Sequence, residues 1–350
     1  MSFDEILFYA LFGGALLAVS ALLTWVLMKR VRIIDNPNER SSHTRPTPRS
    51  GGIAIVATFF IGLIAMAVMK DAPVLSAPYF WAFCASAFAI AALSIFDDLQ
   101  GLSFKAKLAV QTLCAGGVMF MGVTADQVYL PGIGLWELGW LAYPITLVWI
   151  IGLTNAFNFM DGIDGIAGGT AMVASGFFAY IMMAGGSVYL HHIVWVVLWS
   201  CAGFLLWNWQ PAKIFMGDSG SQFLGFILAV FAVLAGQFDP SHVPYVVMPL
   251  LFFHYMWDTV YTFVRRLRAG ENVTQAHRSH LYQLMNQLGL SHAQVTSLYL
   301  TIGVLQGLAA LVLVRLQPQW QLLVFVPFII IQLILTRVVI ARARAQGLVA

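Results

Sequence analysis

Long apolar runs fill this chain, and they constrain its fold more than any other feature. A helix needs about 20 consecutive apolar residues to cross the hydrocarbon core of a bilayer. The sequence of 350 residues is 60% hydrophobic and only 9% charged, whereas soluble domains carry about 25% charged residues. So little charge cannot cover a water-soluble surface, and so much apolar content excludes disorder. We therefore expect an all-α polytopic membrane protein, with residues 1–350 forming a single integral-membrane domain.

Cutting the runs at proline, glycine and charge clusters predicts eleven transmembrane helices. They cover residues 6–28, 51–69, 78–96, 106–124, 138–154, 167–184, 191–208, 220–236, 243–264, 296–315 and 321–340. An odd number of spans places the two termini on opposite sides of the membrane. The first run follows Asp4 and Glu5 rather than basic residues, which favours a retained span over a cleaved signal peptide.

The basic residues are distributed very unevenly over this predicted topology. Sixteen of the 18 fall on one side, namely Lys29, Arg30, Arg32, Arg40, Arg45, Arg49, Lys105, Lys107, Lys213, Arg265, Arg266, Arg268, Arg278, Arg337, Arg342 and Arg344. Because Lys and Arg accumulate in cytoplasmic loops, we predict that this side is cytoplasmic, with the N-terminus outside and the C-terminus inside. The predicted cytoplasmic loops cover about residues 29–50, 97–105, 155–166, 209–219 and 265–295.

Carboxylates gather in the same predicted loops as the cations. Asp97 and Asp98 are adjacent just after the predicted span at 78–96. Asp218 lies in a Gly-Asp-Ser-Gly-Ser segment at the start of the predicted span at 220–236. Paired carboxylates either bind a cation or share a proton, and a helix N-terminus binds anions. Each pattern alone also fits a solvated helix cap. Together they indicate a cytoplasmic site that binds metal ions and phosphates.

The segment from Asn155 to Asp164 carries the most specific pattern. Asn155, Asn158, Asp161 and Asp164 recur at every third residue, with a glycine after each aspartate. Steps of three would spread these side chains over about half of an α-helix, whereas a tighter turn would bring them together. Oxygen ligands alone suit Mg²⁺, which takes one or two carboxylates together with substrate phosphates. An Asx-rich turn is the structural alternative.

Two basic loops complete the predicted cytoplasmic face. Arg49 lies in a proline- and glycine-rich loop, which is either a phosphate-binding loop or a flank beside anionic lipid. His277, Arg278 and His280 lie in the last large loop and are suited to holding phosphate oxygens or transferring protons. Asp258 falls inside a predicted span, where a carboxylate is either functional or paired with a neighbouring helix.

Taken in order, these motifs resemble the polyprenyl-phosphate N-acetylhexosamine-1-phosphate transferases. The matching pieces are residues 43–52, 97–98, 155–169, 216–221, 258–259 and 277–281, so the resemblance spans about residues 35–290. It is closest to bacterial members that initiate O-antigen-type glycans and weaker to the muramoyl-pentapeptide transferases. In one departure from the family pattern, Tyr282 and Gln283 stand where members often have two histidines.

The resemblance implies roles for individual residues. Asp218 and Asn158 would hold Mg²⁺, with Mn²⁺ as a substitute, and Asp97 and Asp98 would be catalytic by orienting or deprotonating the lipid phosphate. Lys107 would contact the diphosphate. The substrate-binding residues expected in total are Arg49, Lys107, Asp161, Asp164, His277, Arg278 and His280.

The resemblance also implies a reaction and a location. A UDP-N-acetylhexosamine, carrying GlcNAc or a related sugar such as FucNAc, would transfer its sugar 1-phosphate to undecaprenyl phosphate and release UMP, the first step of O-antigen or surface-polysaccharide assembly. The protein would lie in the bilayer of the bacterial inner membrane. No nucleic-acid partner is expected, and a homodimer remains open.

Three other functions compete with this interpretation. A muramoyl-pentapeptide-type transferase of peptidoglycan synthesis and a phosphatidyl-type transferase would use similar groups. A transporter would instead show midplane charges and paired repeats of discontinuous helices. The sequence has only Asp258 clearly inside a predicted span and shows no repeat, which disfavours the transporter.

Overall fold

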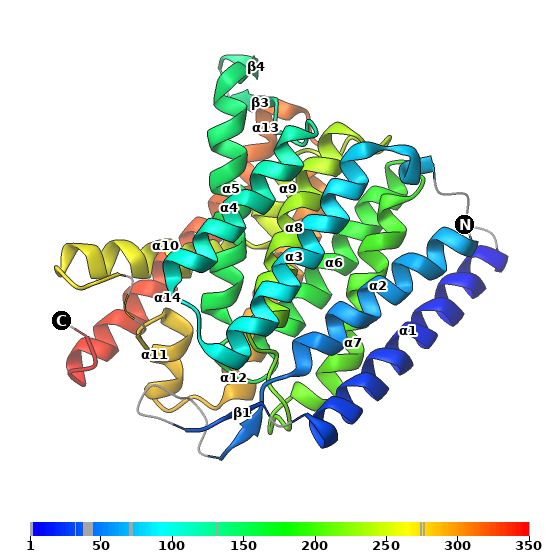
Figure 1. Cartoon of the computed structure of the whole chain (residues 1–350). Helices are drawn as coiled ribbons and strands as arrows, with labels where there is room; N and C mark the ends of the chain where they lie inside the picture. The colour runs from blue at the N-terminus through cyan, green and yellow to red at the C-terminus, as the bar shows by residue number, and fades with distance from the viewer. Residues whose placement is uncertain are drawn as a thin grey trace.

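The chain forms a bundle of helices with two short β-ribbons (Figure 1). The computed structural model describes residues 3–31, 33–37, 45–69, 73–130, 132–273, 275 and 277–349. The long helices are α1 (Phe3–Arg30), α2 (Gly51–Met69), α3 (Pro78–Gln100), α4 (Phe104–Phe120), α5 (Ala142–Met160), α6 (Ile166–Ala184), α7 (Leu190–Asn208), α8 (Asp218–Gln237), α10 (Phe253–Arg268), α12 (His292–Leu313) and α14 (Val326–Ala345). The short helical elements are η1 (Pro73–Ser76), η2 (Gly139–Leu141), α9 (Val247–Leu251), α11 (Leu281–Gln287), α13 (Pro318–Gln321) and η3 (Leu322–Phe325).

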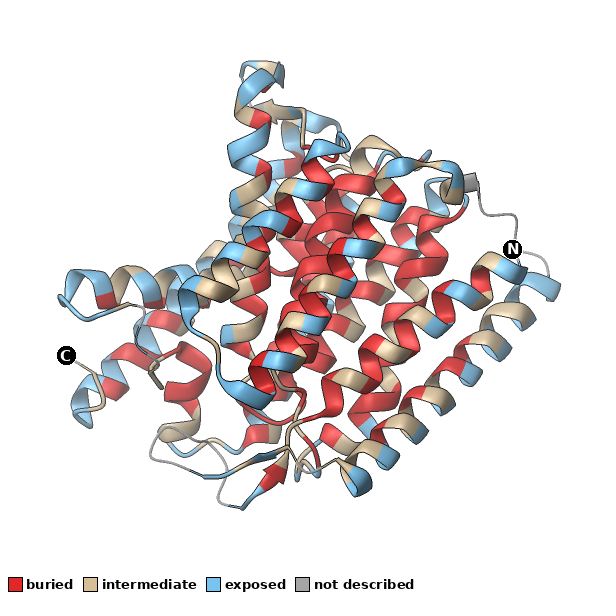
Figure 2. Ribbon diagram, viewed as in Figure 1, coloured by how far each residue is buried: buried red, intermediate tan, exposed pale blue. Residues whose placement is uncertain are grey.

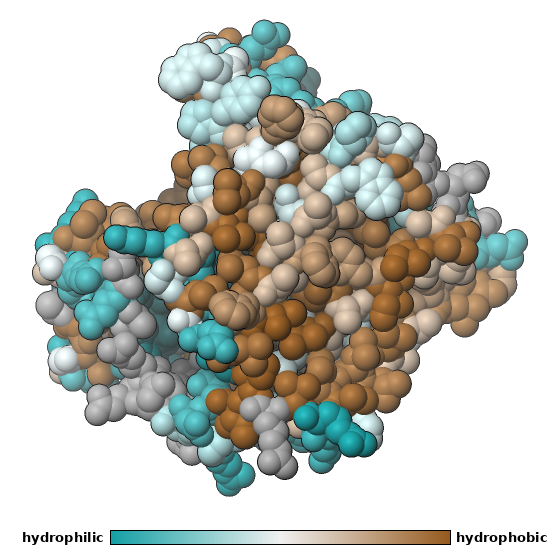
Figure 3. Space-filling view, in the orientation of Figure 1, coloured by the Kyte–Doolittle hydropathy of each residue, from teal (hydrophilic) through white to brown (hydrophobic). Residues whose placement is uncertain are grey.

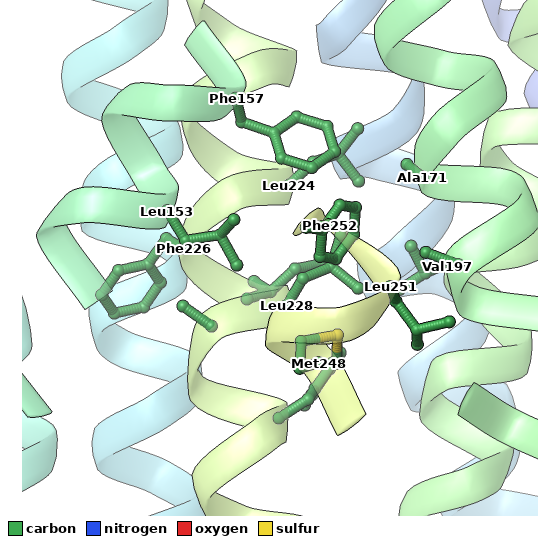
Figure 4. Packing of buried hydrophobic residues seen from close by; sticks show 14 of the residues in the cluster. Leu153, Phe157, Ala171, Val197, Leu224, Phe226, Leu228, Met248, Leu251 and Phe252 are labelled. Atoms are coloured by element: carbon green, nitrogen blue, oxygen red, sulfur yellow. The ribbon is translucent and has the colours of Figure 1, made fainter. Parts of the chain in front are cut away.

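Helix α8 is the centre of the bundle. Every residue from Ser219 to Ala235 is buried, and α3 and α5 pack along it. Figure 2 shows this buried interior, and Figure 4 shows Leu224 and Leu228 of α8 packed near Leu153 and Phe157 of α5. A helix that is apolar on all sides must be enclosed by other helices, so the N-terminus of α8 is held at a fixed place at one end of the bundle.

The structure supports the predicted class, although it does not confirm the count of eleven spans. Nine helices among the described residues are long and apolar enough to cross a membrane. The run at 106–124 yields α4, which has 17 residues. The run at 243–264 is divided at Phe252 into α9 and α10, and α10 projects sideways from the bundle (Figure 1).

The surface of the bundle fits a lipid environment. Leu113 and Val148 are 73% and 71% exposed, although they lie within helices α4 and α5. Apolar side chains cover the middle of the visible face, and hydrophilic ones lie at its upper, left and lower margins (Figure 3). A soluble monomer rarely exposes so large an apolar surface, so the described helices form a multi-pass membrane protein.

The segments predicted as loops contain more regular structure than expected. Strands β1 (Ile34–Asp35) and β2 (Thr47–Pro48) pair antiparallel, as do β3 (Gln127–Leu130) and β4 (Gly134–Glu137). The predicted loops at 97–105 and 155–166 begin too early, because α3 continues to Gln100 and α5 continues to Met160. The predicted loop at 265–295 contains the end of α10 and all of α11. These polar segments are helical because their side chains find partners at one end of the bundle.

Candidate active site

The N-terminus of α8 is capped by a carboxylate from another helix. Oδ1 of Asp98, in the last turn of α3, accepts the backbone N–H of Asp218 at 3.0 Å, and its Oδ2 accepts that of Ser219 at 3.0 Å. A carboxylate is favourable there because the first N–H groups of a helix have no partner within it. Gly217 has a φ of 72°, and a Cβ on it would lie 2.8 Å from Asp98 Oδ2. Only glycine at position 217 therefore lets the end of α3 approach the start of α8 so closely.

Arg49 reaches the same carboxylate from the first loop. Its Nη2 donates to Asp98 Oδ1 at 2.8 Å. Backbone bonds fix this approach, since Phe215 N–H donates to the Pro48 carbonyl and Gly51 N–H donates to the Phe215 carbonyl. Residues 38–44, including the first part of the motif at 43–52, lie outside the described residues. The described part of that motif is thus tied to the start of α8, and Arg49 balances the charge of the capping carboxylate.

Lys107 bridges two carboxylates that come from different helices. Its Nζ lies 2.8 Å from Asp97 Oδ2 and 3.1 Å from Asp218 Oδ2. The other oxygen of Asp97 accepts the backbone N–H of Leu102 at 2.6 Å, just after α3 ends. The adjacent aspartates therefore differ in their contacts, because Asp98 caps α8 while Asp97 contacts the lysine.

Asn158 joins this cluster from the last turn of α5. Its Nδ2 donates to Asp218 Oδ1 at 3.1 Å and to Ser221 Oγ at 3.0 Å. Gln222 Nε2 donates to Asp218 Oδ2 at 3.0 Å. Asn155, one turn earlier, instead donates to Gln111 Oε1 at 2.8 Å. The three-residue repeat therefore does not converge on one point, as expected for side chains on a regular helix.

The two aspartates after α5 lie in different surroundings. Asp164 is buried, accepts the backbone N–H of Ala212 through Oδ2, and has Oδ1 at 3.1 Å from His292 Nδ1. Asp161 directly follows α5. Burial, and then the negative charges of Asp218, Asp98 and Asp164, raise the pKa of Asp161 to about 8. The Asp164 side chain thus holds the loop together, whereas Asp161 lies within the electrostatic reach of Asp218.

The raised pKa of Asp161 predicts a pH dependence of stability. An unfolded aspartate titrates near 3.9, so between about pH 4 and pH 8 the folded protein keeps a proton that the unfolded chain has released. The ligand-free protein should therefore lose stability as the pH rises through this range. Asp161→Asn should reduce the fall in melting temperature between pH 6 and pH 8. Parallel melting curves for the variant and the wild type would contradict the assignment.

A second cluster forms around the buried Asp258 of α10. Its carboxylate accepts the backbone N–H groups of Leu281 and Tyr282 at 2.9 and 3.1 Å and the hydroxyl of Tyr299 at 2.9 Å. His280 Nδ1 lies 3.1 Å from Asp258 Oδ1. Of the two sequence interpretations of Asp258, pairing with a neighbouring helix is the one that the structure shows. The carboxylate fixes both the start of α11 and the ring of His280.

His277 and Arg278 lie beside this cluster. The ring of His277 stacks on that of His280, with centroids 4.9 Å apart. Burial, followed by the charges of His280 and Arg266, lowers the pKa of His277 to about 4, so this ring is neutral at pH 7. Arg278 donates through Nη2 to Asn286 Oδ1 at 3.2 Å, and its Nε finds no partner among the described residues. That Nε is buried, so only the outer end of the guanidinium is placed to meet an anion.

Phe159 connects the two clusters. It follows Asn158 on α5, its ring stacks on His280 with centroids 6.1 Å apart, and its carbonyl accepts the Tyr282 hydroxyl at 3.0 Å. The contacts therefore assemble two clusters, one of Arg49, Asp97, Asp98, Lys107, Asn158 and Asp218 and the other of His277 and His280. Arg278 adjoins His277 in the sequence, and Asp161 lies within the electrostatic reach of Asp218. Asp164 contacts His292 and Ala212 instead.

The sequence reasoning missed two polar residues of the first cluster. Ser221 and Gln222 both bond to its members, but they lie where an apolar span was expected to begin. Their spacing was the available signal, because Ser221 and Gln222 are three and four residues after Asp218 and therefore lie on the same face of a helix.

The donor set fits a magnesium ion that is shared with substrate. Within the part of the chain that is described, no three His, Cys, Asp or Glu side chains gather as a protein-only metal cage would require. Asp218 and Asn158 supply oxygen-bearing side chains on adjacent helices. Mg²⁺ is usually bound by one or two carboxylates together with phosphates and water, which agrees with so sparse a set.

Fold and site together define a class of protein, namely polytopic membrane proteins with a mixed-charge site at one end of the helix bundle. Cations and carboxylates alternate there, as binding of several anions together with a metal ion requires. Residues 80–236 match the sequence model of the glycosyl transferase family 4.

Curated relatives cover most of the chain. A probable undecaprenyl-phosphate N-acetylglucosaminyl 1-phosphate transferase from Bacillus subtilis is 32% identical over 89% of this chain and 87% of its own. A decaprenyl-phosphate N-acetylglucosaminephosphotransferase from Mycobacterium leprae is 31% identical over 81% and 77%. A phospho-N-acetylmuramoyl-pentapeptide-transferase from Shouchella clausii is 31% identical over only 54% and 61%. The chain belongs to the polyprenyl-phosphate N-acetylhexosamine-1-phosphate transferase family.

Proposed function

We propose that this protein transfers an N-acetylhexosamine 1-phosphate from a UDP-sugar to undecaprenyl phosphate on the cytoplasmic face of the bacterial inner membrane. The transfer of N-acetylglucosamine 1-phosphate to a polyprenyl phosphate is what the names of the best-covered relatives state. The pentapeptide transferase covers a smaller share of the chain, so it is the second candidate. Because the chain belongs to a family of transferases, a transporter is no longer a candidate.

One observation supports this proposal most directly. Lys107 joins Asp97 of α3 to Asp218 of α8, and Asn158 of α5 bonds to the same Asp218. A site for a nucleotide diphosphate and a lipid phosphate needs fixed cations close to metal-binding oxygens. This arrangement provides both on rigid helix ends.

In the proposed reaction, an oxygen of the lipid phosphate attacks the β-phosphorus of the UDP-sugar. A new P–O bond forms, the bond from the β-phosphorus to the bridging oxygen breaks, and UMP leaves with that oxygen and its electron pair. A phosphate monoester has a second pKa near 6 and is largely ionised at pH 7. Asp97 therefore orients the attacking group through Lys107 more than it removes a proton.

The remaining residues neutralise and position the two substrates. Mg²⁺ held by Asp218 and Asn158, or Mn²⁺ in its place, would neutralise charge on the diphosphate when bound. Lys107 would offer its ammonium to a phosphoryl oxygen, and the positive charge of Arg278 would attract the anionic substrate. Asp258 holds the ring of His280, which stacks on Phe159 and belongs to the second cluster.

The test uses the purified protein in nanodiscs that contain undecaprenyl phosphate. We expect a labelled UDP-N-acetylhexosamine to give labelled lipid and UMP in the presence of Mg²⁺, and added UMP to reverse the reaction. UDP-GlcNAc, UDP-FucNAc and UDP-MurNAc-pentapeptide are compared in parallel. Transfer from the pentapeptide donor alone would select the second candidate, and transfer from none would overturn the proposed function. A product with GlcNAc or FucNAc would begin an O-antigen or other surface polysaccharide.

The proposed orientation has its own test with single cysteines. In a background without Cys84, Cys114 and Cys201, we expect Ser103→Cys and Ala269→Cys to resist impermeant thiol reagents in intact cells, because the basic residues around them favour the cytoplasmic side. Glu137→Cys, on the exposed β4 strand, should be labelled. Labelling of only one of Ser103→Cys and Ala269→Cys would place the two parts of the site on opposite sides of the membrane.

A further inference from the structure

We infer that Tyr282 is a positioning residue, whose hydroxyl holds the metal-binding end of α5 in register with His280. This inference rests on the proposed function for its catalytic consequence and on the contacts of Tyr282 for its structural content. Tyr282 and its neighbour Gln283 are the residues at which this chain departs from the family pattern described above.

Tyr282 is held at both ends and is fully buried. Its backbone N–H donates to Asp258 Oδ2 at 3.1 Å, so its main chain is fixed to α10. Its hydroxyl donates to the carbonyl of Phe159 at 3.0 Å, so its tip is fixed to α5. A rigid aromatic side chain with two such anchors acts as a spacer of constant length between α11 and α5.

The carbonyl that accepts the Tyr282 hydroxyl lies at the end of α5, next to Asn158. Phe159 belongs to the last turn of α5, whose carbonyls have no partner within the helix. The residue just before it, Asn158, bonds to Asp218 and Ser221. A shift of the Phe159 peptide therefore moves the Asn158 side chain relative to Asp218, although neither residue touches Tyr282 directly.

Gly162 provides an independent sign of the same contact. A Cβ at this position would overlap the Tyr282 hydroxyl and would lie 3.0 Å from Tyr282 Cζ and 3.2 Å from Gln283 Nε2. The backbone of the segment after α5 is thus packed directly against the tip of Tyr282. Glycine is required here by the space that the tyrosine occupies.

Gln283 stabilises the same arrangement from the other side. Its Oε1 accepts the backbone N–H of His280 at 3.2 Å, which closes a capping box at the start of α11. His280 in turn stacks on Phe159. The pair Tyr282 and Gln283 therefore fixes His280 and the end of α5 as one unit, and the two clusters of the site keep a constant separation.

The first test measures kinetics. Tyr282→Phe removes only the hydroxyl, and we expect it to raise the Mg²⁺ concentration for half-maximal transfer about tenfold, because a small misplacement of positioned groups is costly. The KM for undecaprenyl phosphate should be unchanged, because Asp97 and Lys107 are fixed by contacts that do not involve Tyr282. Tyr180→Phe, at a 49% exposed position in α6, is the matched control and should behave as wild type. An unchanged Mg²⁺ dependence in Tyr282→Phe, or an equal loss in all kinetic constants, would overturn the inference.

The second test needs neither substrate nor metal. Gly162→Ala should lower the melting temperature by several degrees in the wild-type background, and Tyr282→Phe should recover at least half of that loss, because it removes the overlapping atom. An equal loss in both backgrounds would refute the packing on which the inference rests. Absence of transfer activity in the wild type would overturn the proposed function and leave this thermal comparison to decide the role of Tyr282.

Discussion

Asp218→Asn should lose about 100- to 1,000-fold in the rate of transfer while remaining folded, because loss of one preorganised polar group from a catalytic site typically costs about that much. The substitution removes the formal charge that pairs with Lys107 and that the proposed Mg²⁺ would bind. It leaves the backbone N–H of residue 218 in place, so the cap from Asp98 persists. The measurement is the initial rate at saturating substrates over a range of Mg²⁺ concentrations, together with a melting curve.

The control removes a carboxylate charge from the β3–β4 ribbon, away from the site. Glu137→Gln changes an exposed residue of β4 and should leave both the rate and the melting temperature unchanged. Near wild-type turnover of Asp218→Asn at limiting Mg²⁺ would remove Asp218 from the metal site. A large fall in its melting temperature would show that the charge serves the fold instead.

Lys107→Ala should reduce the transfer rate about 100-fold, whereas Lys105→Ala should change it less than twofold. Lys107 lies between Asp97 and Asp218, at 2.8 and 3.1 Å, so its loss leaves two nearby carboxylates without their shared cation. Lys105 is exposed on the first turn of α4. Exposed charges contribute little because water screens them.

The comparison of the two lysines separates a catalytic role from a membrane flank. If both act only as positive residues beside the bilayer, the two variants should have equal effects on rate and on the amount of protein in the membrane. Addition of Mg²⁺ should partly restore Lys107→Ala if repulsion between the carboxylates is the main defect. No response to Mg²⁺ would assign the loss to the missing contact with the substrate.

The class of fold could be predicted from the sequence because apolar length is a direct signal of a membrane-spanning helix. The division of the run at 243–264 could not, because mostly apolar and aromatic residues continue from α9 across Phe252 into the first turn of the amphipathic helix α10. Pro249 does not reveal the break either, since it lies in the first turn of α9, where proline replaces no helical hydrogen bond. The polar residues Asp258 and His254 were the better signal of an irregular region.

Many of the side chains that the structure brings together were named from the sequence, although Ser221 and Gln222 were not. The different contacts of each side chain could not be predicted. Asp97 and Asp98 are identical in type and adjacent in sequence, so only the contacts show that one caps α8 and the other holds Lys107. Likewise, the repeat from Asn155 to Asp164 suggested four equivalent ligands. A helix ending at Met160 instead sends these side chains in different directions.

The cap on α8 also has a consequence for how the protein is made. Asp98 precedes its partner Asp218 by 120 residues. At about 5–20 residues per second, the ribosome needs roughly 6 to 24 s to supply that partner. During this interval Asp98 has no helix end to cap, so its charge is left to water and to Arg49, which precedes it in the chain. A chain that stalls before Asp218 already has Arg49 and Lys107 to pair with the two aspartates, but it lacks the helix end that Asp98 caps.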